Sequence, residues 1–163
     1  MYKLDQMIDQ LSFRVRLFIE TIGGNEYPGN LSEREIIFLE YLERKGEVAG
    51  FSEFTAFFKK ISPSTVSNTL KKLYQKGLVT RIESPQDLRS INFSLTDEGR
   101  GMLEPVKRDQ AELSRVIAES LDMTVDESGL VSKIVRRAVL SFDAWMGFEE
   151  VSASEEPRKK LQN

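Results

Sequence analysis

The side chains of this sequence that are best suited to binding a ligand lie in one short stretch, ISPSTVSNTLKKLYQKGLVTR (residues 61–81). Short polar side chains come first and lysines follow at helical spacing: Ser64, Thr65, Ser67, Asn68, Lys71 and Lys72. Hydroxyl and amide groups can hydrogen-bond to base edges, and lysines can pair with phosphates. The stretch therefore favours a nucleic-acid partner. The alternative is an ordinary solvated helix face, and for Ser67 alone the two interpretations carry equal weight.

The sequence contains no cysteine and no histidine. This excludes disulfides, thiol redox sensing, Cys/His zinc sites and every catalytic triad built on Cys or His. We also find no nucleophile–base pair, no metal-ligand spacing and no phosphate-binding loop, so the sequence predicts a protein that is not an enzyme and uses no cofactor or metal. An enzyme is the weakest of the rival hypotheses, and turnover in a substrate screen would revive it.

Charge is unevenly distributed along the chain. The net charge of −3 argues mildly against a polyanionic partner. Residues 59–89, however, carry seven basic side chains against two acidic ones, whereas residues 1–58 carry six against ten and residues 90–163 ten against fourteen. A positive middle between two negative flanks is typical of a localised binding site for a polyanion.

The polar stretch is predicted to form a helix that ends at Gly77. Ser62 can cap its start, and Pro63 suits the first turn because its missing N–H would be unpaired there in any case. A glycine at position 77 fits the left-handed backbone that often ends a helix. Apolar residues at spacings of four and three form the buried stripe: Val66, Leu70 and Leu73. The polar side chains then lie on the outer faces.

Other elements are predicted on both sides of this helix. Ser32 and Glu35 form a capping box at the start of an earlier helix that ends near Gly46. A short helix over residues 52–60 presents three phenylalanines that we expect in the core rather than stacked on bases: Phe54, Phe57 and Phe58. After Gly77, strand-type segments at 78–83 and 91–95, joined by a loop at 84–90, predict a hairpin.

Amphipathic helices are predicted at residues 4–22, 97–121 and 126–148. Their apolar stripes fit either the core of one chain or a seam between two chains, and both can hold. The predicted fold class is mainly α with a small β-hairpin wing: a winged helix-turn-helix flanked by dimerisation helices. The expected divisions are a dimerisation helix and linker (1–30), the winged unit (31–100), further dimerisation helices (101–150) and a frayed tail (151–163).

Three motifs in register resemble the MarR family of bacterial transcription regulators: PSTVSNTLKKLYQKGLVTR, then DLRS, then LTDEG. The resemblance is most specific over residues 62–101. It implies that the polar residues of the predicted helix, Ser64, Thr65, Ser67 and Asn68, lie in the major groove of double-stranded DNA, with Lys71 and Lys72 on the backbone. It also implies that Arg89 enters the minor groove, held by Asp87. The chain departs from the family pattern at Asn68, where arginine is common, and at Leu88 in the wing.

The resemblance further implies a homodimer on a pseudo-palindromic operator. Repression, relieved by a small aromatic or phenolic effector, is the commonest outcome for such proteins, and activation is the alternative. The sequence does not identify the effector site, although Phe13, Arg14, Arg16 and Phe18 are candidates. No apolar run is long enough to cross a bilayer, so we expect a cytoplasmic protein with no membrane partner. The rival hypothesis from another class is a winged-helix module that binds a protein partner and not DNA.

Overall fold

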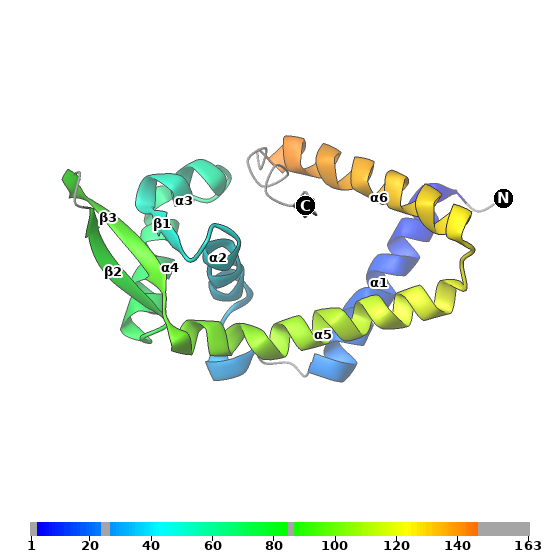
Figure 1. Cartoon of the computed structure of the whole chain (residues 1–163), viewed down its shortest axis with the longest axis horizontal. Coiled ribbons are helices and arrows are strands. Elements are labelled where there is room, and N and C mark those ends of the chain that lie inside the picture. The colour runs from blue at the N-terminus through cyan, green and yellow to red at the C-terminus, as the bar shows by residue number, and fades with distance from the viewer. Residues whose placement is uncertain (1–2, 24–26, 85–86, 147–163) are drawn as a thin grey trace, which may run out of the picture. The chain divides into compact units, whose positions relative to one another are not determined.

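The computed structural model describes residues 3–23, 27–84 and 87–146, without the side chains of residues 19, 22, 23, 84 and 87–90. It confirms a mainly helical chain with a small antiparallel sheet (Figure 1). In chain order the helices and strands are α1 (Leu4–Gly23), the 3-10 turn η1 (Pro28–Asn30), α2 (Glu33–Arg44), β1 (Val48–Gly50), α3 (Phe51–Phe57), α4 (Pro63–Gln75), β2 (Val79–Ser84), β3 (Asp87–Leu95), α5 (Asp97–Leu121) and α6 (Val125–Met146). The predicted tail at 151–163 lies outside the described residues.

The described chain forms two compact units. The first comprises residues up to 51 and residues 67–122, and it contains α1, α2, the sheet, most of α4 and α5. The second comprises residues 52–66 and the described residues from 123 onward, and it contains most of α3, the first turn of α4 and α6.

The first unit has an apolar core to which α2, α4, the sheet and α5 contribute. Its buried side chains include Ile36, Leu39 and Leu42 of α2, Leu70 and Leu73 of α4, Phe93 and Leu95 of β3, and Leu103 of α5. The predicted buried stripe of α4, Val66, Leu70 and Leu73, is therefore confirmed. Helix α2 starts with the predicted capping box, in which the Ser32 hydroxyl accepts from the Glu35 N–H and the Glu35 carboxylate accepts from the Ser32 N–H.

The sheet differs from the prediction in two ways. A third strand, β1, pairs with β3 and gives the strand order β1-β3-β2. In addition, the predicted loop at 84–90 is wrong, because Ser84 closes β2 and residues 87–90 begin β3. The pairing of Ser84 with Asp87, beyond an irregularity after Glu83, extends the hairpin past the segments that residue type alone identifies as strands.

Helix α5 begins as predicted, with the Thr96 hydroxyl accepting a hydrogen bond from the Gly99 N–H at 3.0 Å. The same hydroxyl donates to the carbonyl of Gly77, which lies in the turn between α4 and β2. Thr96 therefore connects the start of α5 to the end of α4. Further along, α5 lies beside α1 (Figure 1).

The second unit contains the phenylalanines of the short helix. Phe54 and Phe58 are buried and Phe57 is half-buried, which confirms the prediction that they pack rather than stack on bases. Helix α6, in contrast, has no buried residue among those described. The Lys60 ammonium of this unit lies 4.2 Å from the centre of the Trp145 ring.

Candidate nucleic-acid interface

The first turn of α4 carries a cluster of hydroxyl groups. The Ser62 Oγ accepts a hydrogen bond from the Thr65 N–H at 3.2 Å, so Ser62 caps the helix as predicted, and Pro63 is its first residue. The same oxygen lies 3.0 Å from the Ser64 Oγ and 2.8 Å from the Thr65 Oγ1. Ser64 is exposed and Thr65 is half-buried. The hydroxyls are therefore held together at the tip of the helix, where its positive dipole end also favours an anion.

The polar and apolar faces of α4 are clearly separated. The buried residues on its inner face are Val66, Thr69, Leu70 and Leu73. The exposed predicted site residues on its outer face are Ser64, Ser67, Asn68, Lys71 and Lys72. The sequence thus predicted the outward placement of these five side chains, and Thr65 is the one that is partly covered. Their contacts with DNA stay a prediction.

The lysines of α4 and its following turn fall into two classes. Among the described residues, Lys71 and Lys72 have no acidic group within ion-pair distance, so their charge is available to a ligand. Lys76, which the charge distribution placed in the same positive segment, instead pairs with Glu35 of α2 at 2.8 Å. The positive surface is therefore smaller than the sequence count indicates.

Glu35 is buried and has several hydrogen-bond donors around it. Its carboxylate accepts from the Ser32 N–H at 2.8 Å, from the Ser32 hydroxyl at 2.9 Å and from the Lys76 ammonium at 2.8 Å. Burial alone would raise the pKa of Glu35, but the hydrogen bonds from Lys76 and Ser32 outweigh it and lower the pKa below its ordinary value. One charged carboxylate therefore fixes the start of α2 against the end of α4.

The turn from α4 into β2 depends on Gly77, whose φ of +72° lies in the left-handed region. This role was predicted for Gly77, because residues with a side chain are strained at a positive φ. The Leu78 N–H donates to the Leu73 carbonyl at 3.0 Å, and the chain then enters β2. The polar helix and the hairpin are thus joined by one short, well-defined turn.

The hairpin contributes one contact that the sequence did not predict. The guanidinium of Arg81 in β2 lies over the ring of Tyr74 in the last turn of α4, 4.6 Å from its centre. The two predicted wing residues, Asp87 and Arg89, are in β3 rather than in a loop, and their side chains lie outside the description. The predicted Asp87–Arg89 ion pair stays a prediction.

Residues 38–91 match the model of the MarR family. The matched segment contains the second half of α2, β1, α3, α4, β2 and the first residues of β3, and so includes every predicted contact residue.

Curated relatives that the chain matches are named as transcriptional regulators. The chain is 34% identical over 68 residues to the regulator SarZ of Staphylococcus saprophyticus, and 34% identical over 88 residues to PecS of Dickeya dadantii. These alignments cover 42% and 53% of this chain, and 44% and 53% of the two relatives, so the chain spans about half the length of the curated relatives it matches. An uncharacterised regulator of Bacillus subtilis, YdgG, is 29% identical over 69% of this chain and 76% of its own length.

Solved MarR-type structures share the fold. Streptococcus pneumoniae FabT in complex with DNA has a TM-score of 0.71 at 19% identity, covering 87% of this chain and 96% of that one. A MarR-like regulator of Thermotoga maritima has a TM-score of 0.64 at 20% identity, covering 88% and 99%. These likenesses confirm the predicted winged helix-turn-helix.

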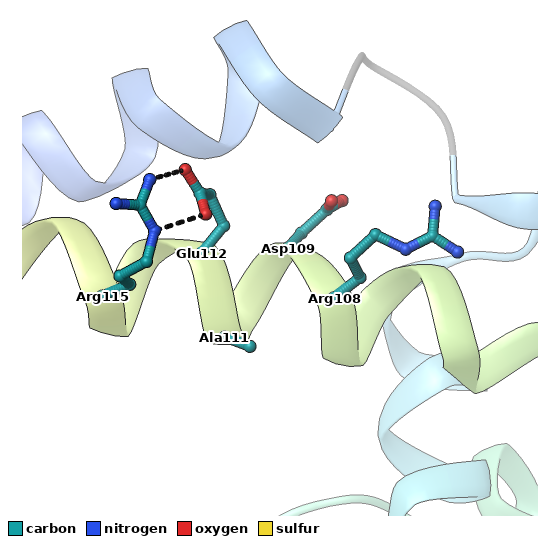
Figure 2. Close-up of a pocket in the computed structure, with 5 residues that line it drawn as sticks. All are labelled: Arg108, Asp109, Ala111, Glu112 and Arg115. Carbon is teal, nitrogen blue, oxygen red and sulfur yellow. Dashed lines mark hydrogen bonds and ion pairs between the residues drawn. The ribbon is translucent and has the colours of Figure 1, made fainter.

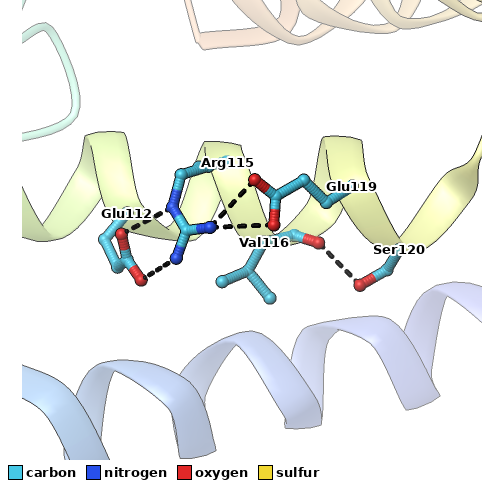
Figure 3. Close-up of polar contacts among 5 residues, drawn as sticks. All are labelled: Glu112, Arg115, Val116, Glu119 and Ser120. Atoms are coloured by element: carbon cyan, nitrogen blue, oxygen red, sulfur yellow. Dashed lines mark hydrogen bonds and ion pairs between the residues drawn. The ribbon is translucent and has the colours of Figure 1, made fainter.

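A shallow depression on α5 is lined by Arg108, Asp109, Ala111, Glu112 and Arg115, and Figure 2 shows that all five belong to this one helix. The Arg115 guanidinium lies between Glu112 and Glu119, which accept hydrogen bonds from it at 2.6–3.0 Å (Figure 3). The hydrogen bonds to Glu112 and Glu119 raise the pKa of Arg115, so the guanidinium stays protonated. The negative charges of the two carboxylates offset its positive charge. The depression contains none of the four candidate effector residues.

The helices outside the segment that matches the family model expose large apolar side chains. In α1 these include Leu4, Met7, Ile8, Leu11, Phe13 and Leu17. In α6 they include Leu130, Ile134, Val135, Phe142 and Trp145, of which Trp145 is 67% exposed. No described helix is long and apolar enough to span a membrane. Large exposed apolar patches are common at interaction sites of soluble proteins.

Proposed function

We propose that this chain is a sequence-specific, DNA-binding transcription regulator and not an enzyme. The observation that carries the proposal is the two-faced helix α4. Its inner face is buried, and its outer face presents hydroxyls, an amide and two lysines that have no acidic partner among the described residues. Its place within the segment that matches the MarR family model, and the regulators named among its relatives, support the same function.

In this proposal α4 is the recognition helix. Ser64, Thr65, Ser67 and Asn68 face base edges in the major groove, and Lys71 and Lys72 pair with phosphates. The hairpin is the wing, with Arg89 in the minor groove and Asp87 orienting it. FabT, which shares the fold, was solved in complex with DNA, and this supports the same partner here.

The proposed assembly is a cytoplasmic homodimer that represses transcription from a pseudo-palindromic operator. The exposed apolar faces of α1 and α6 support it, because a monomer would leave them in water. An aromatic or phenolic effector would release the DNA by binding one state of the dimer more tightly than the other. Phe13, Arg14, Arg16 and Phe18 of α1 are the candidate effector residues. The structure gives Phe13 as exposed and Phe18 as half-buried.

The test is binding of labelled duplex DNA from a random pool, followed by sequencing of the retained sites, with affinity measured across a series of salt concentrations. We expect log K to fall linearly with log[salt], and Lys71→Gln to lower the slope by about 1 because one phosphate contact is lost. Lys107→Gln is the matched control, since Lys107 already pairs with Glu43 and Glu104. Its slope should equal that of the wild type.

Absence of salt-dependent binding to any duplex would overturn the proposal and favour the rival, a winged-helix module that binds a protein partner. An equal fall in slope for Lys71→Gln and Lys107→Gln would show that the effect is one of overall charge and not of the α4 surface. The two outcomes are distinguishable from one titration series.

A further inference from the structure

Arg81 and Tyr74 form a pair where the proposed recognition helix meets the wing. Tyr74 is in the last turn of α4 and 45% of its surface is exposed. Arg81 is the third residue of β2, and its guanidinium carbon lies 4.6 Å from the centre of the Tyr74 ring. This is within the distance at which a cation is attracted to an aromatic face.

The strand register shows on which side of the sheet Arg81 lies. Arg81 pairs with Phe93, and Val79 pairs with Leu95. Because alternate residues of a strand point to the same face, and paired residues of neighbouring strands do too, these four side chains share one face. Val79, Phe93 and Leu95 are buried and Arg81 is exposed. Arg81 therefore lies on the core-facing side of the sheet, beyond the edge of the core and towards α4.

The helical spacing of α4 also places Tyr74 at the end of the helix's polar stripe, next to Arg81. Ser64, Asn68, Lys71 and Tyr74 follow one another at intervals of four, three and three, which keeps them on one stripe of the helix. Tyr74 is the last member of that stripe, and Arg81 lies on its ring. The guanidinium thus continues the polar, basic stripe of α4 onto β2.

The chemistry of the pair leaves Arg81 able to bind. A guanidinium that rests on an aromatic ring keeps the N–H groups of its edge free, and those groups match two oxygens of a phosphate. Among the described residues, no carboxylate lies within ion-pair distance of Arg81. Glu83, which shares its face of β2, is exposed and makes no such pair. Lys76, by comparison, is neutralised by Glu35.

We propose that Arg81 is a further DNA-contact residue, a phosphate anchor between the recognition helix and the wing, and that Tyr74 is the positioning residue that holds it. This inference rests on the proposed function. It adds one sequence-independent contact at the point where the DNA backbone would pass between the two elements that reach into its grooves.

The experiment measures the affinity of the full chain for its selected operator and for random duplex from 50 to 200 mM salt, in wild type and in Arg81→Gln. We expect Arg81→Gln to weaken both DNAs by the same factor and to lower the salt slope by about 0.9. The gap between variant and wild type should therefore be about 3.5-fold wider at 50 mM than at 200 mM salt. Arg81→Lys should keep the wild-type slope, and Arg108→Gln, which removes an exposed arginine of α5, is the matched control.

A second pair of variants tests the role of Tyr74. Tyr74→Phe keeps the ring and should bind as the wild type does. Tyr74→Leu should weaken binding, but it should add little to Arg81→Gln in the double variant, because both act on one contact. Thermal unfolding of each variant separates a loss of folding from a loss of contact.

Three results would overturn the inference: an unchanged slope in Arg81→Gln, a loss confined to the operator, or full additivity of Tyr74→Leu and Arg81→Gln. Each of them leaves the proposed function intact if the wild type binds DNA with a salt-dependent affinity. Absence of such binding by the wild type contradicts the proposed function itself, so the two failures are distinct.

Discussion

At the scale of single residues, the decisive side chain is Glu35. It completes the capping box of α2 and also binds Lys76, which lies 41 positions further along the chain, just after α4. A buried carboxylate is costly unless it is paired and hydrogen-bonded, and Glu35 is both. One ionised group therefore links the start of α2 to the end of α4, in addition to the apolar core that the two helices share.

Glu35→Gln should destabilise the protein by about 1–2 kcal/mol at pH 7, since hydrogen bonds to a charged group are lost. The pKa of Glu35 is lowered in the fold, so its stabilisation is present in full above the carboxyl's ordinary value and is lost as the pH falls through the folded value. Urea unfolding from pH 7 to pH 3.5 should show the gap between wild type and variant closing below about pH 4.5.

Glu43→Gln serves as the control for Glu35→Gln. Glu43 pairs with Lys107, but more of its surface is exposed, and such pairs contribute about 0–1 kcal/mol. A gap for Glu35→Gln that stays constant with pH would show that shape, and not charge, is what matters at this position.

At the scale of elements, the sequence predicted the features that residues close together in the chain determine. The capped helices α2, α4 and α5 begin where Ser32, Ser62 and Thr96 indicate, because a cap is formed by residues a few positions apart. Strand β1 was missed, because three residues acquire strand geometry only through their pairing with β3, more than forty positions away. The extension of β3 to Asp87 was missed for the same reason.

For the candidate site, too, local features were predicted and contacts between separate elements were not. The outward placement of Ser64, Ser67, Asn68, Lys71 and Lys72 follows from helical periodicity and was predicted correctly. The pairing of Lys76 with Glu35 and the stacking of Arg81 on Tyr74 join separate elements, so no local pattern indicates them. Arg81 is part of the motif that resembles the MarR family, but no pattern in the sequence indicates that its guanidinium stacks on Tyr74.

The contact between α5 and the start of β2 gives a prediction at this scale. A Cβ at Gly99 would lie 2.2 Å from the Leu78 carbonyl oxygen and 2.8 Å from Leu95 Cδ1. Gly99→Ala should therefore destabilise the protein by about 3 kcal/mol or more, as overpacking against rigid backbone does. Gly101→Ala, two positions along the same helix with nothing within 4 Å, should stabilise it by up to about 1 kcal/mol. Thermal unfolding of both variants measures the contrast, and equal stabilities would contradict the close approach.

At the scale of the whole molecule, α1 and α6 expose apolar surface that needs a partner to cover it. The described residues of α6 include none that is buried, yet Leu130, Ile134, Phe142 and Trp145 recur along it at helical spacing. A helix of this kind is stable in water only when something covers it. A second copy of the chain is the occupant that the proposed function requires, because two recognition helices read two half-sites.

Ile134→Asp tests whether a second copy of the chain covers the apolar side of α6. In a two-fold symmetric interface each substitution occurs twice, and each buried isoleucine contributes about 1.5–3 kcal/mol, so the dimer dissociation constant should rise by about 100-fold or more. Sedimentation velocity should then show a monomer at concentrations where the wild type is a dimer. Ser132→Asp, on the polar side of the same helix, is the matched control and should leave the dimer intact.

The same variant connects assembly to DNA binding. A dimer places its recognition helices about 34 Å apart, in successive major grooves, and gains affinity from holding both half-sites at once. Ile134→Asp should therefore lose its preference for the full operator over a single half-site, while its residual binding keeps the salt dependence that Lys71 provides. Undiminished discrimination between full and half operators by a monomeric Ile134→Asp would show that the two lobes do not act together, and α6 would then need another partner to cover it.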